Sequence, residues 1–129
     1  MGKIEESRLL LKRLASTNTL PWFCIKDFNE LMNSRENEGG STHPARQMKK
    51  LCEVISTCQL RDFGYVGQDF TWTRRFGDIG WIKERLDRAL VSTNWVSKFP
   101  RTQLHHKSKS SSDHCVLILK EIQVEKRRR

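Results

Sequence analysis

The sequence has no apolar run approaching the roughly 20 residues that a membrane-spanning helix needs, and its first seven residues are polar. These absences predict neither a membrane span nor a secretory signal. The four cysteines form no close C-x-x-C pair, and no cysteine–histidine spacing matches a usual zinc pattern. We therefore expect an intracellular protein with reduced thiols and no membrane partner.

The chain carries a large excess of basic residues. Its 129 residues include 24 Lys and Arg against 15 Asp and Glu, which gives a net charge of +9. Such a balance favours a polyanionic partner, nucleic acid above all, although an inert basic surface is the alternative. Part of the excess lies in a basic tail at residues 123–129, whose last four residues fit either a weak nuclear address or no signal at all.

Two amphipathic helices are predicted. The first covers residues 5–16, where leucines recur among charged residues. The second begins at residues 42–44, where proline is tolerated in the first turn. Its apolar residues fall at i, i+3, i+4 and i+7, and they are Met48, Leu51, Cys52 and Ile55. We expect this stripe to be buried against a sheet that contains Phe23, Ile25 and Leu117.

Apolar or alternating runs predict strands at residues 21–28, 60–63, 69–75, 101–107 and 115–122. Residues 81–92 fit a helix as well as they fit a strand, so periodicity leaves both open. A single helical turn is expected at 95–99. The order of elements predicts an α/β (α+β) fold, in which helices cover one face of a mixed sheet.

Polar residues that can do chemistry follow the ends of the predicted strands. They are Asp27 with Asn29, then Asp87, then Asp113 with His114. Phosphodiester hydrolysis needs a base, donors to the phosphoryl oxygens and usually a cation held by carboxylates. These residue types can supply those roles. Equally, Asp and Asn often only turn the chain, and many Asp-His pairs are ordinary surface residues.

Four ordered motifs point to a family. They are Trp22-Phe23-Cys24-Ile25-Lys26-Asp27-Phe28-Asn29-Glu30, Phe70-Thr71-Trp72-Thr73, Glu84-Arg85-Leu86-Asp87-Arg88-Ala89-Leu90 and Ser112-Asp113-His114-Cys115. Together they resemble the endonuclease/exonuclease/phosphatase (DNase I-like) superfamily, and most closely the endonuclease domains of plant LINE-type retrotransposons. The resemblance implies a four-layer α/β sandwich, makes residues 82–91 a strand, and implies phosphodiester cleavage with Mg²⁺ or Mn²⁺ on DNA.

The resemblance also implies a role for each polar residue. Asp27 would orient or deprotonate the attacking water, and Asn29 would donate to the phosphoryl oxygen or position Asp27. Asp87 would accept a hydrogen bond from His114, which would stabilise the developing phosphorane charge. Asp113 would lie at the metal or its water shell. The candidates for phosphate contacts are Arg74, Arg75 and Arg88.

Two departures from the family qualify this hypothesis. Lys26 replaces a glycine, which adds a long charged side chain beside the site. More importantly, only the C-terminal half of the family domain is matched, so residues 1–122 form a partial domain. The half that brings an Asn and a metal-binding Glu has no match. We therefore expect either a truncated nuclease, weak or inactive unless another chain completes it, or a non-catalytic basic remnant that binds nucleic acid non-specifically.

Overall fold

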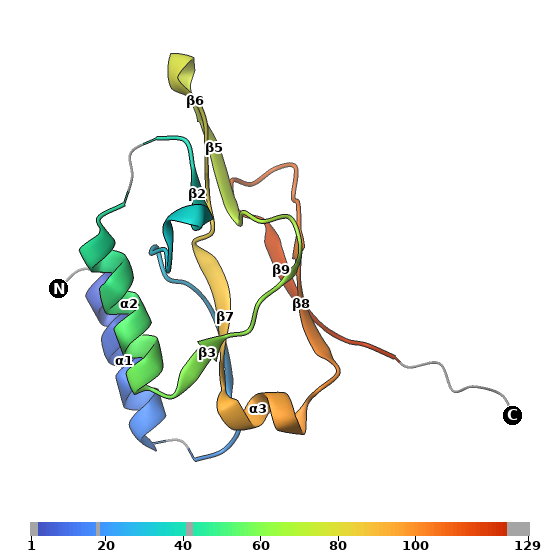
Figure 1. The fold of residues 1–129 in the computed structure, drawn as a ribbon. Helices are drawn as coiled ribbons and strands as arrows, with labels where there is room; N and C mark the ends of the chain where they lie inside the picture. The colour runs from blue at the N-terminus through green and yellow to red at the C-terminus, as the bar shows by residue number, and fades with distance from the viewer. Residues whose placement is uncertain (1–2, 18, 41–42, 124–129) are drawn as a thin grey trace, which may run out of the picture.

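A computed structural model describes residues 3–17, 19–40 and 43–123, and these form a mixed α/β structure (Figure 1). The helical elements within them are α1 (Lys3–Thr17), η1 (Ser34–Glu36), α2 (Ala45–Thr57), η2 (Gly77–Ile79) and α3 (Thr93–Lys98). The strands are β1 (Phe23–Asp27), β2 (Asn37–Glu38), β3 (Leu60–Asp62), β4 (Val66–Gly67), β5 (Trp72–Phe76), β6 (Gly80–Glu84), β7 (Asp87–Ser92), β8 (Thr102–Lys107) and β9 (Val116–Glu121).

The described strands form three small sheets, so the expectation of one mixed sheet is wrong. Their orders are β1-β7-β3, β2-β6-β5 and β4-β8-β9. The first two sheets are antiparallel, and the third is mixed because β4 pairs in parallel with β8. Residues 81–92 contain most of β6 and all of β7, and the two strands are separated by Arg85 and Leu86.

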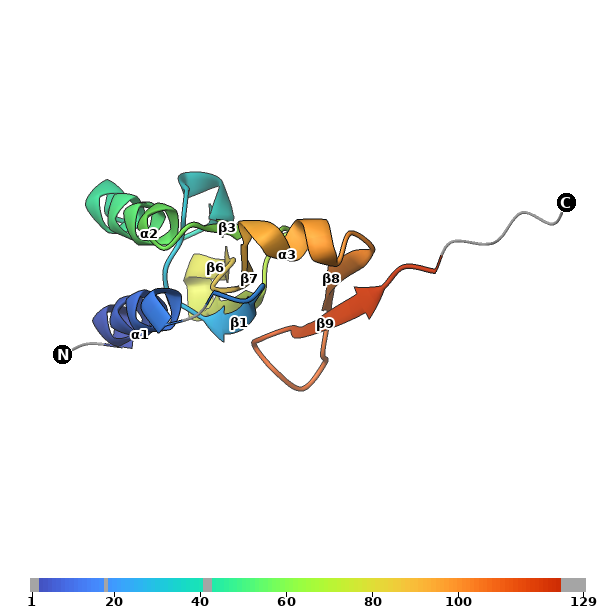
Figure 2. The same ribbon diagram turned by 90° about the horizontal axis from the view of Figure 1, so that it is seen from below.

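Helices α1 and α2 lie side by side on one face of the β1-β7-β3 sheet, and the β8–β9 pair lies on the other side (Figures 1 and 2). The predicted covering of one face by helices is therefore confirmed for this sheet. The core between helices and sheet is formed by Leu11, Phe28, Leu51, Val54, Ile55, Cys58, Leu60 and Leu90. Burying each large apolar side chain contributes about 1.5–3 kcal/mol.

The packing of α2 was predicted correctly for two of the four stripe residues and incorrectly for the strand that they meet. Leu51 and Ile55 are buried, whereas Met48 and Cys52 are half-buried. The side chains that face the helices here are those of Cys24 on β1 and of Trp22 just before it. Because successive strand residues point to opposite faces, Phe23 and Ile25 lie on the other side, where Ile25 is 43% exposed. Leu117 belongs to β9, in a different sheet.

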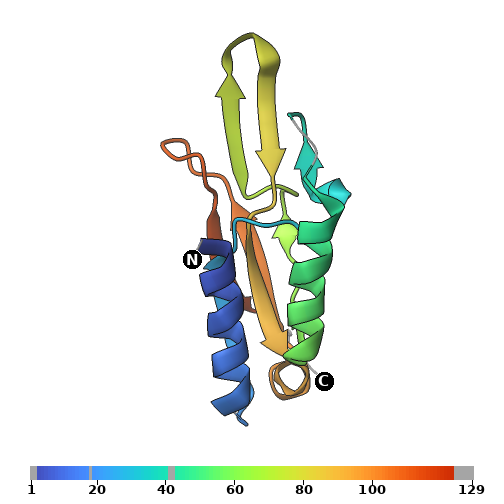
Figure 3. The same cartoon turned by 90° about the vertical axis from the view of Figure 1, so that its left-hand side faces the viewer.

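A long hairpin formed by β5 and β6 projects from the body of the molecule (Figure 3). Its tip carries Phe76, Ile79 and Trp81, which are all exposed.

In the part of the chain that the structure describes, no helix is long and apolar enough to cross a membrane. All four cysteines are free thiols. The basic residues 126–129 lie outside the described residues.

Candidate active site

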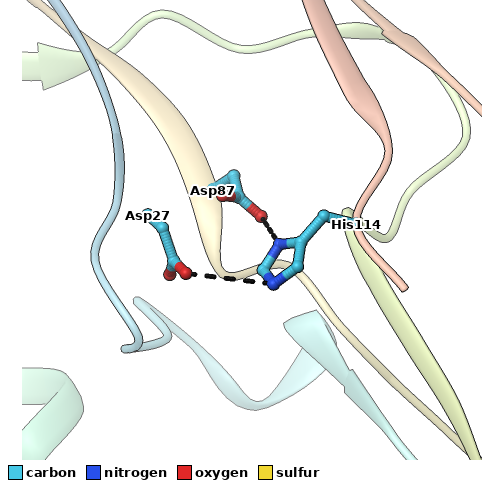
Figure 4. A group of neighbouring side chains, drawn as sticks. All are labelled: Asp27, Asp87 and His114. Carbon is cyan, nitrogen blue, oxygen red and sulfur yellow. Dashed lines mark hydrogen bonds and ion pairs between the residues drawn. The ribbon is translucent and has the colours of Figure 1, made fainter. Parts of the chain in front are cut away.

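Three of the predicted residues meet at one end of the β1-β7-β3 sheet. Asp27 ends β1 and Asp87 begins β7, and the two are direct partners in the antiparallel pairing. His114 reaches them from the segment that bridges to Trp72. His114 Nδ1 lies 2.9 Å from Asp87 Oδ2, within hydrogen-bonding distance, and His114 Nε2 lies 4.0 Å from Asp27 Oδ2 (Figure 4). The predicted contact between Asp87 and His114 is therefore present.

Asp27 is held by the turn that follows it. The backbone N–H of Asn29 donates to Asp27 Oδ1 at 2.9 Å. Asn29 has φ +53°, a left-handed conformation that asparagine tolerates better than most residues. Asp27 therefore turns the chain through one oxygen while the other faces His114. The contact from Asn29 to Asp27 is made by the main chain and does not depend on the asparagine side chain, so the roles expected for that side chain stay predictions.

Thr71 holds the start of β7 and the residue after His114, and this role was not predicted from the sequence. Its side chain is only 1% exposed. Its Oγ1 accepts from the backbone N–H groups of Leu86 and Asp87, both at 2.9 Å. Its carbonyl accepts from the N–H of Cys115 at 2.8 Å. The only signal for this role was the position of Thr71 in the second motif, because nothing local distinguishes a buried threonine from an exposed one.

Asp113 does not join the other three side chains. Its carboxylate Oδ2 lies 3.2 Å from Arg74 Nε, and its carbonyl accepts from the N–H of Thr73 at 3.0 Å. Arg74 and Arg75 lie on β5 and are exposed, as a phosphate contact requires. Lys26 follows the alternation of β1 and leaves the sheet on the face opposite to Asp27, so it is not beside the site.

The expectation that Arg88 contacts phosphate is wrong. Arg88 has no exposed surface. Its guanidinium makes ion pairs with Glu36 at 2.7 Å and with Asp62 at 3.1 Å. Arg85 joins the same cluster, 2.6 Å from Asp62 and 2.9 Å from Glu36. Since β7 points Asp87 into the site, its neighbour Arg88 must point to the helix-covered side.

This buried cluster shifts the titration of its acids. Burial raises the pKa of Glu36, but the hydrogen bond and the charge of Arg88 outweigh burial and lower the pKa below 4.5. The N–H of Met32 and the charge of Arg85 make smaller contributions in the same direction. The pKa of Asp62 is lowered below 3.8 in the same way, chiefly by Arg85 against the opposing effect of burial. Both acids are therefore ionised at neutral pH, and the cluster holds the strand that carries Asp87.

The residues that can hold a metal do not form a complete magnesium site. Among the described residues, Asp27, Asp87 and His114 each place one ligand atom within 4.8 Å of the others. Mg²⁺ prefers six oxygen ligands in near-octahedral geometry, whereas this group offers two carboxylates and an imidazole. Asp113 is directed at Arg74 instead. The described residues thus do not fit Mg²⁺ by themselves.

Comparison of the sequence with protein-family models gives no match, and comparison with curated proteins gives no significant match.

Proposed function

We propose that this chain is the C-terminal half of a DNase I-like nuclease domain of the kind found in LINE-type retrotransposons. It would cleave phosphodiesters efficiently only when a second polypeptide supplies the missing half. The observation that carries the proposal is the row formed by Asp87, His114 and Asp27, with the imidazole between two carboxylates. A base held in place by a second group is what acid–base chemistry needs.

The proposed roles of His114, Asp27 and Asp87 follow from the atoms that face one another in the site. With Nδ1–H donated to Asp87, the other nitrogen of His114 faces Asp27 across 4.0 Å. A phosphoryl oxygen that enters this space would accept a hydrogen bond from protonated Nε2, which stabilises the charge that develops there. Asp27 would accept a proton from the attacking water. Asp87 would keep the imidazole oriented.

The cation implied by the family resemblance would neutralise phosphoryl charge when bound. Because the described residues do not complete a magnesium site, its remaining oxygen ligands would come from the second polypeptide. Without the charge neutralisation by the cation, the activation free energy of cleavage rises by several kcal/mol. Each 1.36 kcal/mol lowers the rate tenfold. The chain alone should therefore nick DNA at least about a thousandfold more slowly than the completed domain.

Nicking of supercoiled plasmid by the purified chain, in Mg²⁺ and in Mn²⁺, tests the proposal. We expect slow nicking that is lost in His114→Ala and in Asp27→Asn. Lys98→Ala serves as the matched control, because Lys98 is exposed on α3 and remote from the site. Equal nicking by all variants would show a contaminating nuclease. Complete absence of His114-dependent nicking would favour the second candidate below.

The second candidate is a non-catalytic polypeptide that binds nucleic acid through charge. It is favoured by the net charge of +9 and by Arg74 and Arg75 on the projecting hairpin. Its binding to nucleic acid should weaken steeply as the salt concentration rises, because bound counterions are released. The binding should show no sequence preference, and His114→Ala should leave it unchanged.

Under either candidate we place the chain inside the cell. The basic residues 126–129 make the nucleus the compartment to examine by imaging a tagged chain with and without them.

A further inference from the structure

His106, on β8, is a buried titratable group that the proposed chemistry does not use. It is 5% exposed, and its ring lies nearly parallel to that of Tyr65, with an angle of 8° and the two centroids 4.3 Å apart. The guanidinium carbon of Arg85 lies 4.6 Å from the centre of the same tyrosine ring. Two planar groups cannot share one face of a ring at these distances, so Tyr65 is packed between His106 and Arg85.

The hydrogen bond of His106 fixes its tautomer. Nδ1 lies 2.8 Å from the backbone carbonyl oxygen of Gln68. A carbonyl only accepts, so Nδ1 carries the proton. Nε2 is buried and has no hydrogen-bond partner among the described residues. Protonation would place a second N–H where these residues offer no acceptor, and a positive charge on the far side of Tyr65 from Arg85. The neutral ring is therefore the form that this packing accommodates.

The charges around His106 act in the same sense as its burial only in part. Burial lowers the pKa of His106 below 6.5, and the charge of Arg85 lowers it further. The hydrogen bond to Gln68 and the charges of Asp87 and Asp62 act in the opposite direction and do not outweigh burial. His106 is therefore neutral at pH 7.

The remaining titratable groups nearby carry no charge or face away from the ring. Burial raises the pKa of the Tyr65 phenol and of the Cys115 thiol, so both are neutral at pH 7. On β8 itself, His105 and Lys107 lie on the face opposite to His106, because successive strand residues alternate. Arg85 is thus the cation that opposes a charge on His106.

His106 holds the segment that supports the candidate site. Its ring anchors the carbonyl of Gln68, and the side chain of Gln68 donates to the carbonyl of Phe70 at 3.0 Å. The next residue is Thr71, whose hydroxyl accepts from two N–H groups at the start of β7. The strand β4, which precedes Gln68, pairs with β8 over only two residues. The bond from His106 is therefore a principal tie between this segment and β8.

We propose that His106 is a positioning residue for the candidate site and that it acts only in its neutral form. The neutral ring ties residues 68–71 to β8 and so keeps Thr71 against the start of β7. Protonation releases the tie. Its contribution is full above about pH 6.5 and is lost as pH falls through the lower folded-state value. The inference rests on the proposed function only for its effect on nicking, because the tie itself is a property of the fold.

The titration of His106 is measured by NMR. Tyr65 is the only tyrosine in the sequence, so a fluorotyrosine label gives one ¹⁹F signal, from the ring that His106 packs against. We expect this signal and the ring signals of His106 to change together, with a midpoint below pH 6.5. His105→Asn is the matched control, because His105 lies on the opposite face of β8 and its loss should leave the midpoint unchanged. A midpoint at or above pH 6.5 would overturn the inference.

The response of the site is measured from backbone amides. Three N–H groups are bonded to Thr71, so their ¹⁵N–¹H signals report on its position, and they belong to Leu86, Asp87 and Cys115. We expect these signals to shift at the midpoint of His106. They should shift in the same way in His114→Ala, which lacks the imidazole of the site. Amide signals that ignore the titration of His106 would show that the ring does not position Thr71.

Two substitutions separate the hydrogen bond from the packing. His106→Asn keeps an N–H donor near the position of Nδ1 but cannot titrate. Its amide signals should stay near the wild-type values at pH 7 and lose the shift in acid. His106→Phe keeps a ring against Tyr65 but has no donor, so its amide signals should be displaced already at pH 7. An unchanged acid shift in His106→Asn, or wild-type signals in His106→Phe, would refute the proposed role.

The nicking assay then separates the tie from the reaction. Where the wild type nicks DNA, its rate relative to His106→Asn should fall about tenfold per pH unit below the midpoint of His106, because the neutral fraction falls by that factor. A relative rate that stays constant with pH would contradict the role of His106 in the reaction. If nicking is absent while the amide signals follow His106, the tie stands and only the proposed reaction is lost.

Discussion

Arg88 Nη2 lies 2.7 Å from a carboxylate oxygen of Glu36, and Arg88 has no surface exposed to solvent. The same guanidinium reaches Asp62 at 3.1 Å and the carbonyl of Arg85 at 3.1 Å. Because β7 carries both Arg88 and Asp87, this ion cluster fixes the strand that supplies one carboxylate of the candidate site. A buried charge is tolerated only when it is paired in this way.

Replacing Arg88 by Met should strongly destabilise the protein. Methionine fills part of the space but leaves Glu36 and Asp62 with one cationic partner fewer. Removing one member of a buried ion pair typically costs 3–5 kcal/mol, and we expect about that loss in the free energy of unfolding measured with urea. Arg61→Met is the control, because Arg61 is exposed on the adjoining strand β3. A loss below about 1 kcal/mol in Arg88→Met would contradict the structure.

The same cluster predicts acid sensitivity. The folded-state pKa values of Glu36 and Asp62 lie below their ordinary values of 4.5 and 3.8. Their contribution to stability is therefore fully present above about pH 4.5 and is lost as pH falls through the folded values. Glu30 acts in the opposite direction. Burial raises its pKa against the attraction of Arg8, so its protonation favours folding in acid and offsets part of the loss.

Urea unfolding at pH 7, 5 and 3 measures this dependence. The variant Glu36→Gln with Asp62→Asn should be less stable than the wild type at pH 7. It should also lose less stability between pH 5 and pH 3, because the two groups that titrate there are gone. A decline as steep in the double variant as in the wild type would assign the acid sensitivity to other carboxylates.

Local patterns predicted the elements of this chain better than their assembly. The stripe through Leu51 and Ile55 placed α2 correctly because one helical period is visible within a dozen residues. Which face of β1 would meet it was predicted incorrectly, since a continuous apolar run such as 22–25 carries no alternation. The division into three sheets depends on contacts between distant segments, and no local pattern records those.

The site shows the same contrast. Asp87 and His114 were predicted to meet because both follow or begin strands, and the structure places them 2.9 Å apart. Arg88 was misassigned because a basic residue in a basic chain suggests a phosphate contact. Once β7 is known to be a strand with Asp87 facing the site, alternation alone directs Arg88 to the core. The role of Thr71 was missed because its hydroxyl accepts hydrogen bonds from two backbone N–H groups of a segment that is distant in the sequence.

Leu51→Asp should unfold much of the protein. Leu51 is fully buried at the contact between α2 and the sheet. The substitution removes about 1.5–3 kcal/mol of burial and places a carboxylate where no partner is available to it without repacking. Circular dichroism during thermal unfolding should show a lost or strongly lowered transition. Lys49→Asp, at an exposed position of the same helix, is the control and should unfold nearly as the wild type does.

The isolated chain should associate into oligomers through the exposed edge of the β4-β8-β9 sheet. Along and just beyond the edge strand β9, the exposed apolar residues are Val116, Leu119 and Ile122, each about 40% accessible. Exposed apolar surface beside a strand edge promotes association. Size-exclusion chromatography with light scattering should show oligomers that Leu119→Lys reduces and Leu9→Lys, on the exposed side of α1, does not. A wild type that stays monomeric at every concentration tested would contradict this.

Thr71→Val should damage stability and the candidate site together. Valine has nearly the shape of threonine but lacks the oxygen that accepts from the N–H groups of Leu86 and Asp87, both 2.9 Å away. Each donor left buried without a partner costs about 1–3 kcal/mol, so urea unfolding should show a loss well above that of a surface substitution. Thr71→Ser keeps the oxygen and should recover most of the stability. If His114-dependent nicking is present in the wild type, it should fall in Thr71→Val and persist in Thr71→Ser, because the start of β7 sets the position of the Asp87 carboxylate. Equal stability of the valine variant and the wild type would show that the hydroxyl does not hold this strand.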